Sequence, residues 1–161
     1  MAEVIQGEQS AVVVKPWWGQ LKAVYVGALA GLTWWILAML IQKYIVEPLA
    51  CTDLASIAAC SGAFGLAGSI AAIMVASTAL FVLIHLYQPR PIIIAGASLV
   101  ILWDLAALMN GLSWWQTLIW AVLLYTLSYS LFSLNARIRN IIVATVVCVV
   151  LVVVIRLLLS L

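Results

Sequence analysis

A series of apolar stretches, each about as long as a bilayer is thick, constrains this chain more than any other feature. Residues 23–42 contain no charged side chain, and several similar stretches follow. Roughly 20 helical residues cross the hydrocarbon core of a bilayer, which is about 30 Å thick. Strands of a transmembrane barrel would instead alternate apolar and polar residues over about ten positions. The sequence therefore predicts an all-α integral membrane protein.

The composition agrees with that class. Of the 161 residues, 68% are hydrophobic and 7% are charged, whereas a soluble domain carries about 25% charged residues. The net charge is only +2, and the basic residues show none of the basic and aromatic patterning of a nucleic-acid reader. We expect the lipid bilayer to be the main partner and nucleic acid not to be one.

We expect a single polytopic bundle of about five transmembrane helices at residues 17–161, preceded by a cytoplasmic tail at residues 1–16. Pro48 discourages continuation of the first helix, and Asn110-Gly111 is typical of a tight turn. The expected spans are residues 21–45, 62–86, 91–109, 113–134 and 140–160, with an outer loop at residues 46–61.

The positions of Lys and Arg indicate the orientation, because cytoplasmic loops carry an excess of both. With the N-terminus inside, the outer side holds only Lys43 and Arg156. The inner side then holds Lys15, Lys22, Arg90, Arg137 and Arg139. This distribution predicts a multi-pass protein of the cell membrane with a cytoplasmic N-terminus and an outer C-terminus.

Cys51 and Cys60 lie in the expected outer loop, on the side where disulfides persist. A disulfide closing this loop would stabilise the fold by roughly 2.7 kcal/mol in the chain-entropy model. A continuous helix would hold the two Cα atoms about 13 Å apart, beyond the roughly 7 Å that a disulfide tolerates. We expect a structural disulfide, with two unpaired thiols or a redox-active pair as alternatives. Cys148, alone in the last span, is typical of a small buried hydrophobe.

Asp104 lies inside the third expected span, where a carboxylate costs about 3 kcal/mol near the centre and indicates a functional site. It lies roughly 6 Å outward of mid-span, and Arg156 in the fifth span lies roughly 9 Å outward. Because the depths are similar and the charges opposite, we expect an ion pair. In the alternatives, Arg156 extends to the outer headgroups and Asp104 is protonated or hydrogen-bonded, or Asp104 binds a proton or cation in a transport path.

Small residues at helical spacing let membrane helices approach each other closely. Such residues occur in the first span and at the start of the second. They are Gly27, Gly31, Gly62, Gly65 and Gly68. We expect them to pack the first span on the second, with a homo-oligomer face as the alternative.

Trp34 and Trp35 lie at the midpoint of the first span, although indoles prefer the membrane interface. Either their N–H groups bond to neighbouring helices, or the rings stack on an apolar or cationic ligand. Adjacent helical residues point about 100° apart, so at most one ring can face any single pocket.

No motif predicts a catalytic residue, a cofactor or a metal site. The lone His85 has no metal-ligand spacing around it, and no P-loop, dinucleotide or HExxH motif occurs. The sequence favours a non-catalytic structural or accessory subunit, or an interaction partner, in a membrane assembly, with self-association as one form of it. The alternatives are a small transporter, channel or substrate-binding subunit using Asp104 and Arg156, and a membrane thiol redox protein using Cys51 and Cys60.

Overall fold

The computed structural model describes residues 16–50, 62–88, 90–136 and 141–160, and the regular structure within these ranges is helical throughout. The elements are α1 (Pro16–Ile41), η1 (Gln42–Val46), α2 (Glu47–Ala50), α4 (Ala63–His85), α5 (Pro91–Leu102), α6 (Leu105–Leu108), α7 (Trp114–Asn135) and α8 (Ile141–Ser160).

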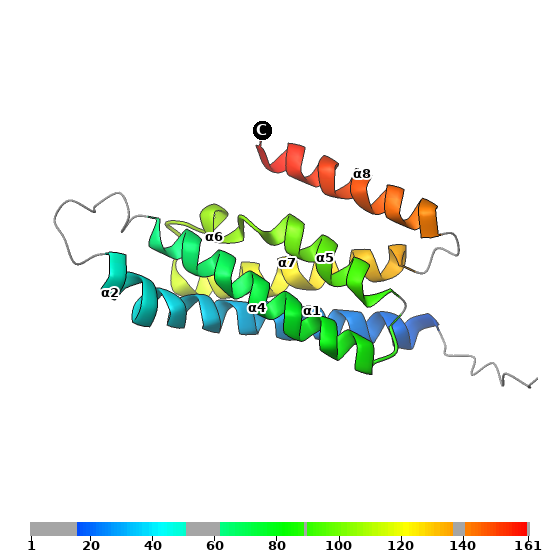
Figure 1. The fold of residues 1–161 in the computed structure, drawn as a ribbon, viewed down its shortest axis with the longest axis horizontal. Coiled ribbons are helices and arrows are strands. Elements are labelled where there is room, and N and C mark those ends of the chain that lie inside the picture. Colours follow the sequence, from blue (N-terminus) through cyan, green and yellow to red (C-terminus); the bar gives the residue numbers. More distant parts are fainter. Residues whose placement is uncertain (1–15, 51–61, 89, 137–140, 161) are drawn as a thin grey trace, which may run out of the picture.

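Through their mutual contacts, α1, α4, α5 and α7 form a closed ring, and neighbours in this ring run antiparallel (Figure 1). α1 packs against both α4 and α7, and α5 closes the ring by packing against the same two helices. α8 lies outside the ring, mainly against α5. Within the described ranges, α1, α4, α5 and α7 therefore form a four-helix bundle with α8 on its flank.

Four helical segments of the described chain are long and apolar enough to cross a membrane: Trp18–Leu49, Ala63–His85, Pro91–Leu108 and Trp114–Asn135. The apolar segment of α8 at Ile142–Val154 is shorter than these four. The expected all-helical bundle is thus confirmed, and its four long apolar helices are compatible with a multi-pass membrane protein. The fifth span and the orientation stay predictions.

The first helix is longer than expected, and the prediction that Pro48 ends it is wrong. α1 is followed without a break by the wider π turn η1 and by α2, so residues 46–50 of the expected outer loop are helical. Proline lacks an N–H group, and its ring clashes with the carbonyl four residues earlier. The π turn shifts the carbonyls that precede Pro48, with the Glu47 N–H bonded to the oxygen of Gln42, five residues back.

The third span is interrupted, whereas the sequence predicted one continuous helix to residue 109. α5 ends at Leu102, and the chain turns at Trp103 and Asp104 before α6 begins. The Leu108 N–H donates to the Asp104 carbonyl, which restores helical geometry beyond the turn. Gly111 then adopts φ +87°, a conformation that glycine allows, and so forms the expected tight turn before α7.

α1 and α7 approach closely because α1 presents glycine to α7. A Cβ added at Gly27 would lie 2.8 Å from the Thr126 Cα atom, and one at Gly31 would lie 2.7 Å from the Val122 Cα atom. The sequence assigned these glycines to the contact with the second span. Their partner is α7 instead, and they are buried inside one chain rather than exposed on a face for a second copy.

Candidate functional site

Trp34 occupies the space between α1, α4 and α7 and is fully buried. Its indole Nε1 donates a 2.9 Å hydrogen bond to the Gly68 carbonyl on α4. Its ring meets Phe64 edge-on at 6.4 Å between centroids and lies 6.1 Å from the Tyr125 ring. A Cβ at Gly68 would approach Ala106 and come within 3.2 Å of the Trp34 ring. The absence of a side chain at Gly68 therefore makes room for the indole.

Trp35 points in a different direction from its neighbour, as the 100° rotation per residue requires. It is half-buried, and its ring centroid lies 6.3 Å from that of Trp114 at the start of α7. Its Nε1 is buried and has no hydrogen-bond partner in the described part of the chain. The two indoles thus have separate environments, one inside the ring and one between α1 and the first turn of α7.

The remaining small residues of the second span differ in their surroundings. Gly62 is exposed and precedes the first residue of α4. A Cβ at Gly65 would have no atom within 4 Å. Of Gly65 and Gly68, only Gly68 is a position whose missing side chain admits a neighbouring helix.

Asp104 lies at the turn between α5 and α6 and is exposed on the outside of the four-helix ring. Arg156 belongs to α8, but its side chain lies outside the described residues. The expected ion pair between them therefore stays a prediction. The sequence analysis did not predict that Asp104 lies at a helix interruption.

Cys51 and Cys60 both lie outside the described residues, so the expected disulfide and the redox alternative stay predictions. The described chain on either side of them ends at Ala50 of α2 and resumes at Gly62, and η1 packs against α4. Cys148 is a free, buried thiol on the side of α8 that faces α5.

A polar layer that the sequence analysis missed connects the helices at one end of the bundle. Gln20 donates from Nε2 to the Ser130 hydroxyl (2.8 Å) and carbonyl (3.0 Å), and its Oε1 accepts from Ser133 (3.4 Å). Gln88, which is buried, donates to the Gly19 carbonyl at 3.0 Å. Asn135 donates to the Ala144 carbonyl at 3.2 Å and so links α7 to α8. The i, i+3 pair of serines near the end of a span was the available signal.

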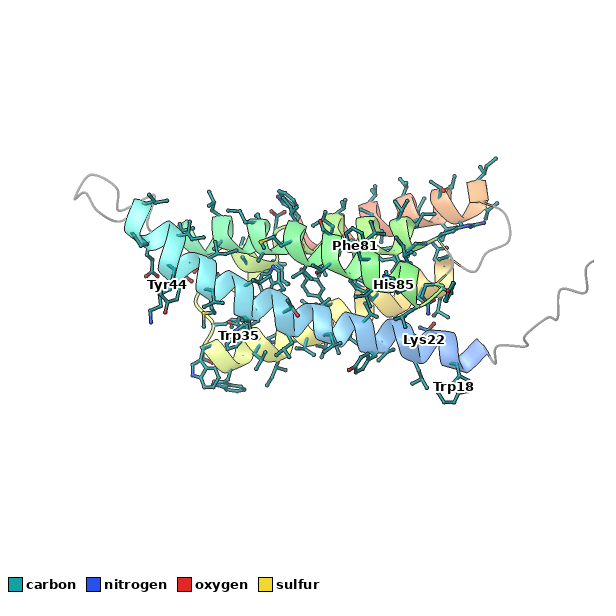
Figure 2. The ribbon with its side chains drawn as sticks, turned by 60° about the horizontal axis from the view of Figure 1, so that its bottom comes forward. Trp18, Lys22, Trp35, Tyr44, Phe81 and His85 are labelled. Carbon is teal, nitrogen blue, oxygen red and sulfur yellow. The ribbon has the colours of Figure 1, made fainter. Side chains whose placement is uncertain are left out.

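Several basic and aromatic residues lie near the two ends of the bundle. Tyr44 lies near one end, and Trp18, Lys22 and His85 lie toward the other (Figure 2). The first end also carries Lys43, whose ammonium group lies 5.9 Å from the Tyr44 ring centroid. Amphipathic aromatic and basic side chains of this kind are typical of membrane–water interfaces.

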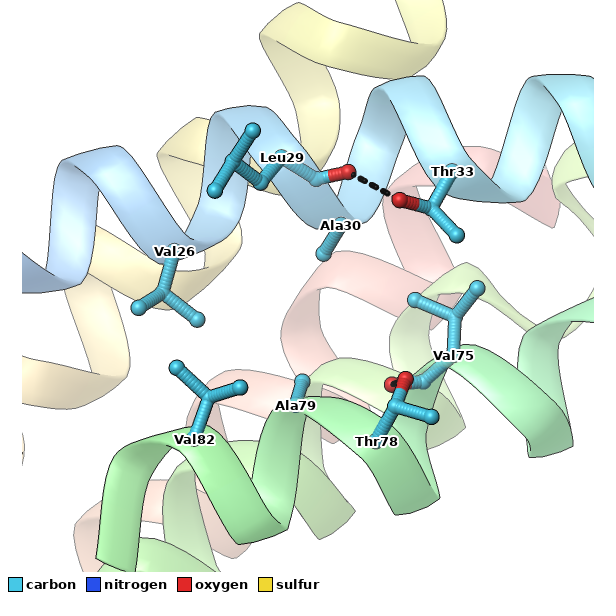
Figure 3. A pocket seen from close by; sticks show the side chains of 8 residues that line it. All are labelled: Val26, Leu29, Ala30, Thr33, Val75, Thr78, Ala79 and Val82. Atoms are coloured by element: carbon cyan, nitrogen blue, oxygen red, sulfur yellow. Dashed lines mark hydrogen bonds between the residues drawn. The ribbon is translucent and has the colours of Figure 1, made fainter. Parts of the chain in front are cut away.

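An apolar groove of about 300 Å³ runs between α1 and α4 (Figure 3). Its floor is formed by four buried residues, Val26, Ala30, Val75 and Ala79. Its rims are formed by four exposed residues, Leu29, Thr33, Thr78 and Val82. We call these eight residues the α1–α4 groove.

The two hydroxyl groups at the rims of the α1–α4 groove bond to their own helices. Thr33 donates to the Leu29 carbonyl at 2.8 Å, and Thr78 donates to the carbonyls of Met74 (3.1 Å) and Val75 (2.9 Å). Each hydroxyl proton is thereby committed within its own helix. What remains for an occupant of the groove is a largely apolar surface of methyl groups.

Within the described ranges, His, Cys, Asp and Glu residues form no group of three or more that could hold a metal ion. We find no match for this chain among protein-family models, curated proteins or solved structures.

Proposed function

We propose that this protein is an accessory subunit of a membrane assembly and that it binds a transmembrane helix of a partner in the α1–α4 groove. The observation that carries the proposal is the construction of this groove, with a small-residue floor, apolar rims and hydroxyl donors already used within each helix. Without a hydrophobic driving force, membrane helices associate through close packing against such surfaces.

The spacing along the groove favours a helix as its occupant. On α1 the lining residues follow the pattern i, i+3, i+4, i+7 from Val26 to Thr33, and on α4 they follow the same pattern from Val75 to Val82. The ridges of a third helix repeat at these intervals and can enter the groove along its length. An acyl chain has no such repeat, so it gains nothing from this periodicity.

The centre of the four-helix ring is filled by side chains, which favours binding of a partner helix on the outside of the ring. Trp34 fills the space between α1, α4 and α7, and its indole N–H is satisfied by Gly68. A ligand or ion path along the ring axis would have to displace this ring and its aromatic neighbours Phe64 and Tyr125. The outer grooves need no such displacement.

The topology is part of this proposal. α8 spans Ile141–Ser160, a length of about 30 Å at 1.5 Å per residue, which suits a fifth crossing. With five crossings and a cytoplasmic N-terminus, Lys22 and Arg90 lie on the cytoplasmic side and Lys43 on the outer side, as the distribution of basic residues favours.

A photo-crosslinking amino acid at position 78, introduced in the native cell membrane, tests the partner helix. Position 77 is the matched control, because Ser77 is also exposed and also bonds its hydroxyl to its own helix, but it does not line the groove. We expect a discrete protein adduct from position 78 and none from position 77. Lipid adducts alone at position 78, or the same protein adduct from both positions, would overturn the proposal.

Transport is the second candidate function, because an ionisable residue at an interrupted span is a feature of transporters, whose substrate sites lie at broken helices. Asp104 at the α5–α6 turn has this placement. If this candidate is right, Asp104→Asn abolishes substrate uptake into vesicles while the protein keeps its thermal stability. If Asp104→Asn abolishes uptake and the protein adduct at position 78 persists, the α1–α4 groove would be the subunit interface of a transporter.

A further inference from the structure

The α1–α4 groove leads to two exposed basic side chains, Lys22 on α1 and His85 at the end of α4. Lys22 lies four residues before Val26, and His85 lies three residues after Val82, and both of these valines line the groove. Side chains three or four positions apart are neighbours on a helix, so Lys22 and His85 continue the two sides of the groove. Figure 2 shows both of them toward the same end of the bundle.

A hydrogen bond on the far side of these two residues holds their segments together. The buried side chain of Gln88 donates from Nε2 to the Gly19 carbonyl at 3.0 Å. Gly19 lies three residues before Lys22, and Gln88 lies three residues after His85. Lys22 and His85 therefore lie at the same level of the bundle, between the groove on one side and this hydrogen bond on the other.

The described residues supply no carboxylate to this end of the groove. The acidic residues within the described ranges are Glu47, which belongs to α2, and Asp104, which directly precedes α6. α2 and α6 lie toward the opposite end of the bundle (Figure 1). An occupant of the groove therefore meets an ammonium group and an imidazole that no acidic side chain of the described structure neutralises.

We propose that the partner helix carries an aspartate or glutamate at this end of the α1–α4 groove and that Lys22 and His85 bind its carboxylate. This inference rests on the proposed function and adds the chemistry of the partner. An ammonium group has three N–H donors, and an imidazole has at least one in either protonation state. Side chains on the two sides of the groove can thus donate to the two oxygens of one carboxylate.

The depth of this contact suits a charged group. Trp18 lies one turn before Lys22 and is exposed, and tryptophan and lysine are typical of the membrane–water interface. A carboxylate at this level avoids the cost of a charge in the centre of the bilayer. Because the rest of the groove is apolar, a charged contact at one end fixes the direction and the depth at which the partner helix lies.

The photo-crosslinking amino acid at position 78 in the native membrane reports the occupancy of the groove. We expect Lys22→Glu to lower the yield of the protein adduct about tenfold or more, because it brings two carboxylates together. Lys22→Arg keeps the charge and should keep the yield within about twofold of the parent. Lys43→Glu is the matched control, since Lys43 is equally exposed on the continuation of α1 but lies at the opposite end, and it should leave the yield unchanged.

The imidazole is varied in the same way. His85→Leu removes the donor and should lower the adduct yield about threefold, whereas His85→Gln keeps an N–H donor and should retain most of it. The melting temperatures of all these variants in detergent should equal that of the parent, because both side chains are exposed.

A carbodiimide identifies the carboxylate directly, because it joins an amine to a carboxylate as an amide with loss of water. In the native membrane it should couple Lys22 to an aspartate or glutamate of the partner that position 78 labels, as identified by peptide mass spectrometry. Lys22→Arg should abolish this product and keep the adduct at position 78. Replacing the coupled acidic residue of the partner by lysine in the Lys22→Glu background should restore the adduct yield to within about twofold of the parent.

The failures of the two proposals are distinguishable. Absence of a protein adduct at position 78 in the parent would overturn the proposed function and this inference with it. A protein adduct with the same yield in Lys22→Glu as in Lys43→Glu would overturn this inference alone. A lower yield in Lys22→Glu without a coupled partner peptide, or without restoration by the reversed pair, would assign Lys22 to lipid phosphate and would also overturn it.

Discussion

The indole Nε1 of Trp34 and the carbonyl oxygen of Gly68 are joined by a 2.9 Å hydrogen bond that connects α1 to α4 inside the bundle. The bond depends on glycine at position 68, where a Cβ would crowd both the indole and Ala106. A residue that sequence alone places in the middle of a lipid-spanning helix thus proves to be the largest fully buried side chain of the described core.

Replacing Trp34 by phenylalanine should destabilise the bundle, whereas the same change at Trp35 should not. The first variant loses the bond to Gly68 and leaves a void, which together cost about 2 kcal/mol or more in the free energy of unfolding. The Trp35 Nε1 is buried without a partner in the described structure, so Trp35→Phe removes an unsatisfied donor. Reversible unfolding in mixed micelles with increasing sodium dodecyl sulfate measures the free energy of unfolding of each variant. Equal decreases in the two variants would contradict the different roles of Trp34 and Trp35.

Alanine at Gly31 should be poorly tolerated and alanine at Gly65 well tolerated. The added Cβ at position 31 lies 2.7 Å from the Val122 Cα atom and forces α1 from α7, at a cost of about 1–3 kcal/mol, whereas position 65 has open space. Thermal denaturation in detergent compares the variants. If Gly31→Ala instead left the melting temperature unchanged and dissociated an oligomer, the glycine would serve self-association.

Gln20→Leu should weaken the polar layer between α1 and α7. It removes the bonds to Ser130 and Ser133, and interhelical bonds of this kind contribute about 0.6–2 kcal/mol in membrane proteins. Gln42→Leu is the control, since Gln42 bonds only to Glu47 of the same helical stretch in the described structure. The unfolding free energy of Gln20→Leu should fall below that of Gln42→Leu, and the reverse order would be inconsistent with the layer.

Cysteine accessibility in intact cells tests the orientation. Tyr44 and Tyr87 are 68% and 94% exposed, so cysteine at either position should leave the core undisturbed. In a background in which the three native cysteines are replaced by serine, we expect an impermeant maleimide to label Tyr44→Cys from outside the cell and Tyr87→Cys only after permeabilisation. Labelling in the opposite pattern would invert the topology, and labelling of both from outside would exclude a complete crossing by α4.

The thiol state of Cys51 and Cys60 tests the expected disulfide. Denatured, unreduced protein should show one reactive thiol, that of Cys148, and three after reduction, in agreement with the three cysteines of the chain. Cys148→Ser is the control and should show none before reduction. Three reactive thiols without a reductant would mean that the pair is unbonded, and a change of state with a quinone or thiol substrate would favour the redox alternative.

The sequence by itself determined which segments are helical. Long uncharged runs have to satisfy their backbone groups internally in lipid, so the second, fourth and fifth expected spans agree with α4, α7 and α8 to within one residue at each end. The sequence analysis also predicted, wrongly, that the first helix ends before Pro48, and it did not predict the turn at Asp104. Both depend on local backbone geometry, a π turn and a helix interruption, that hydropathy does not encode.

Only the tertiary structure decided which helix meets which. A GxxxG pattern indicates a face for close packing but does not identify the helix that packs on it. Gly27 and Gly31 therefore could not be assigned to α7 from the sequence. Likewise, the sequence does not distinguish the adjacent Trp34 and Trp35. In the structure, Trp34 bonds to Gly68 and Trp35 contacts Trp114. In lipid most of each helix surface is apolar, so the choice of partner follows from shape and from a few hydrogen bonds that exist only once the helices are assembled.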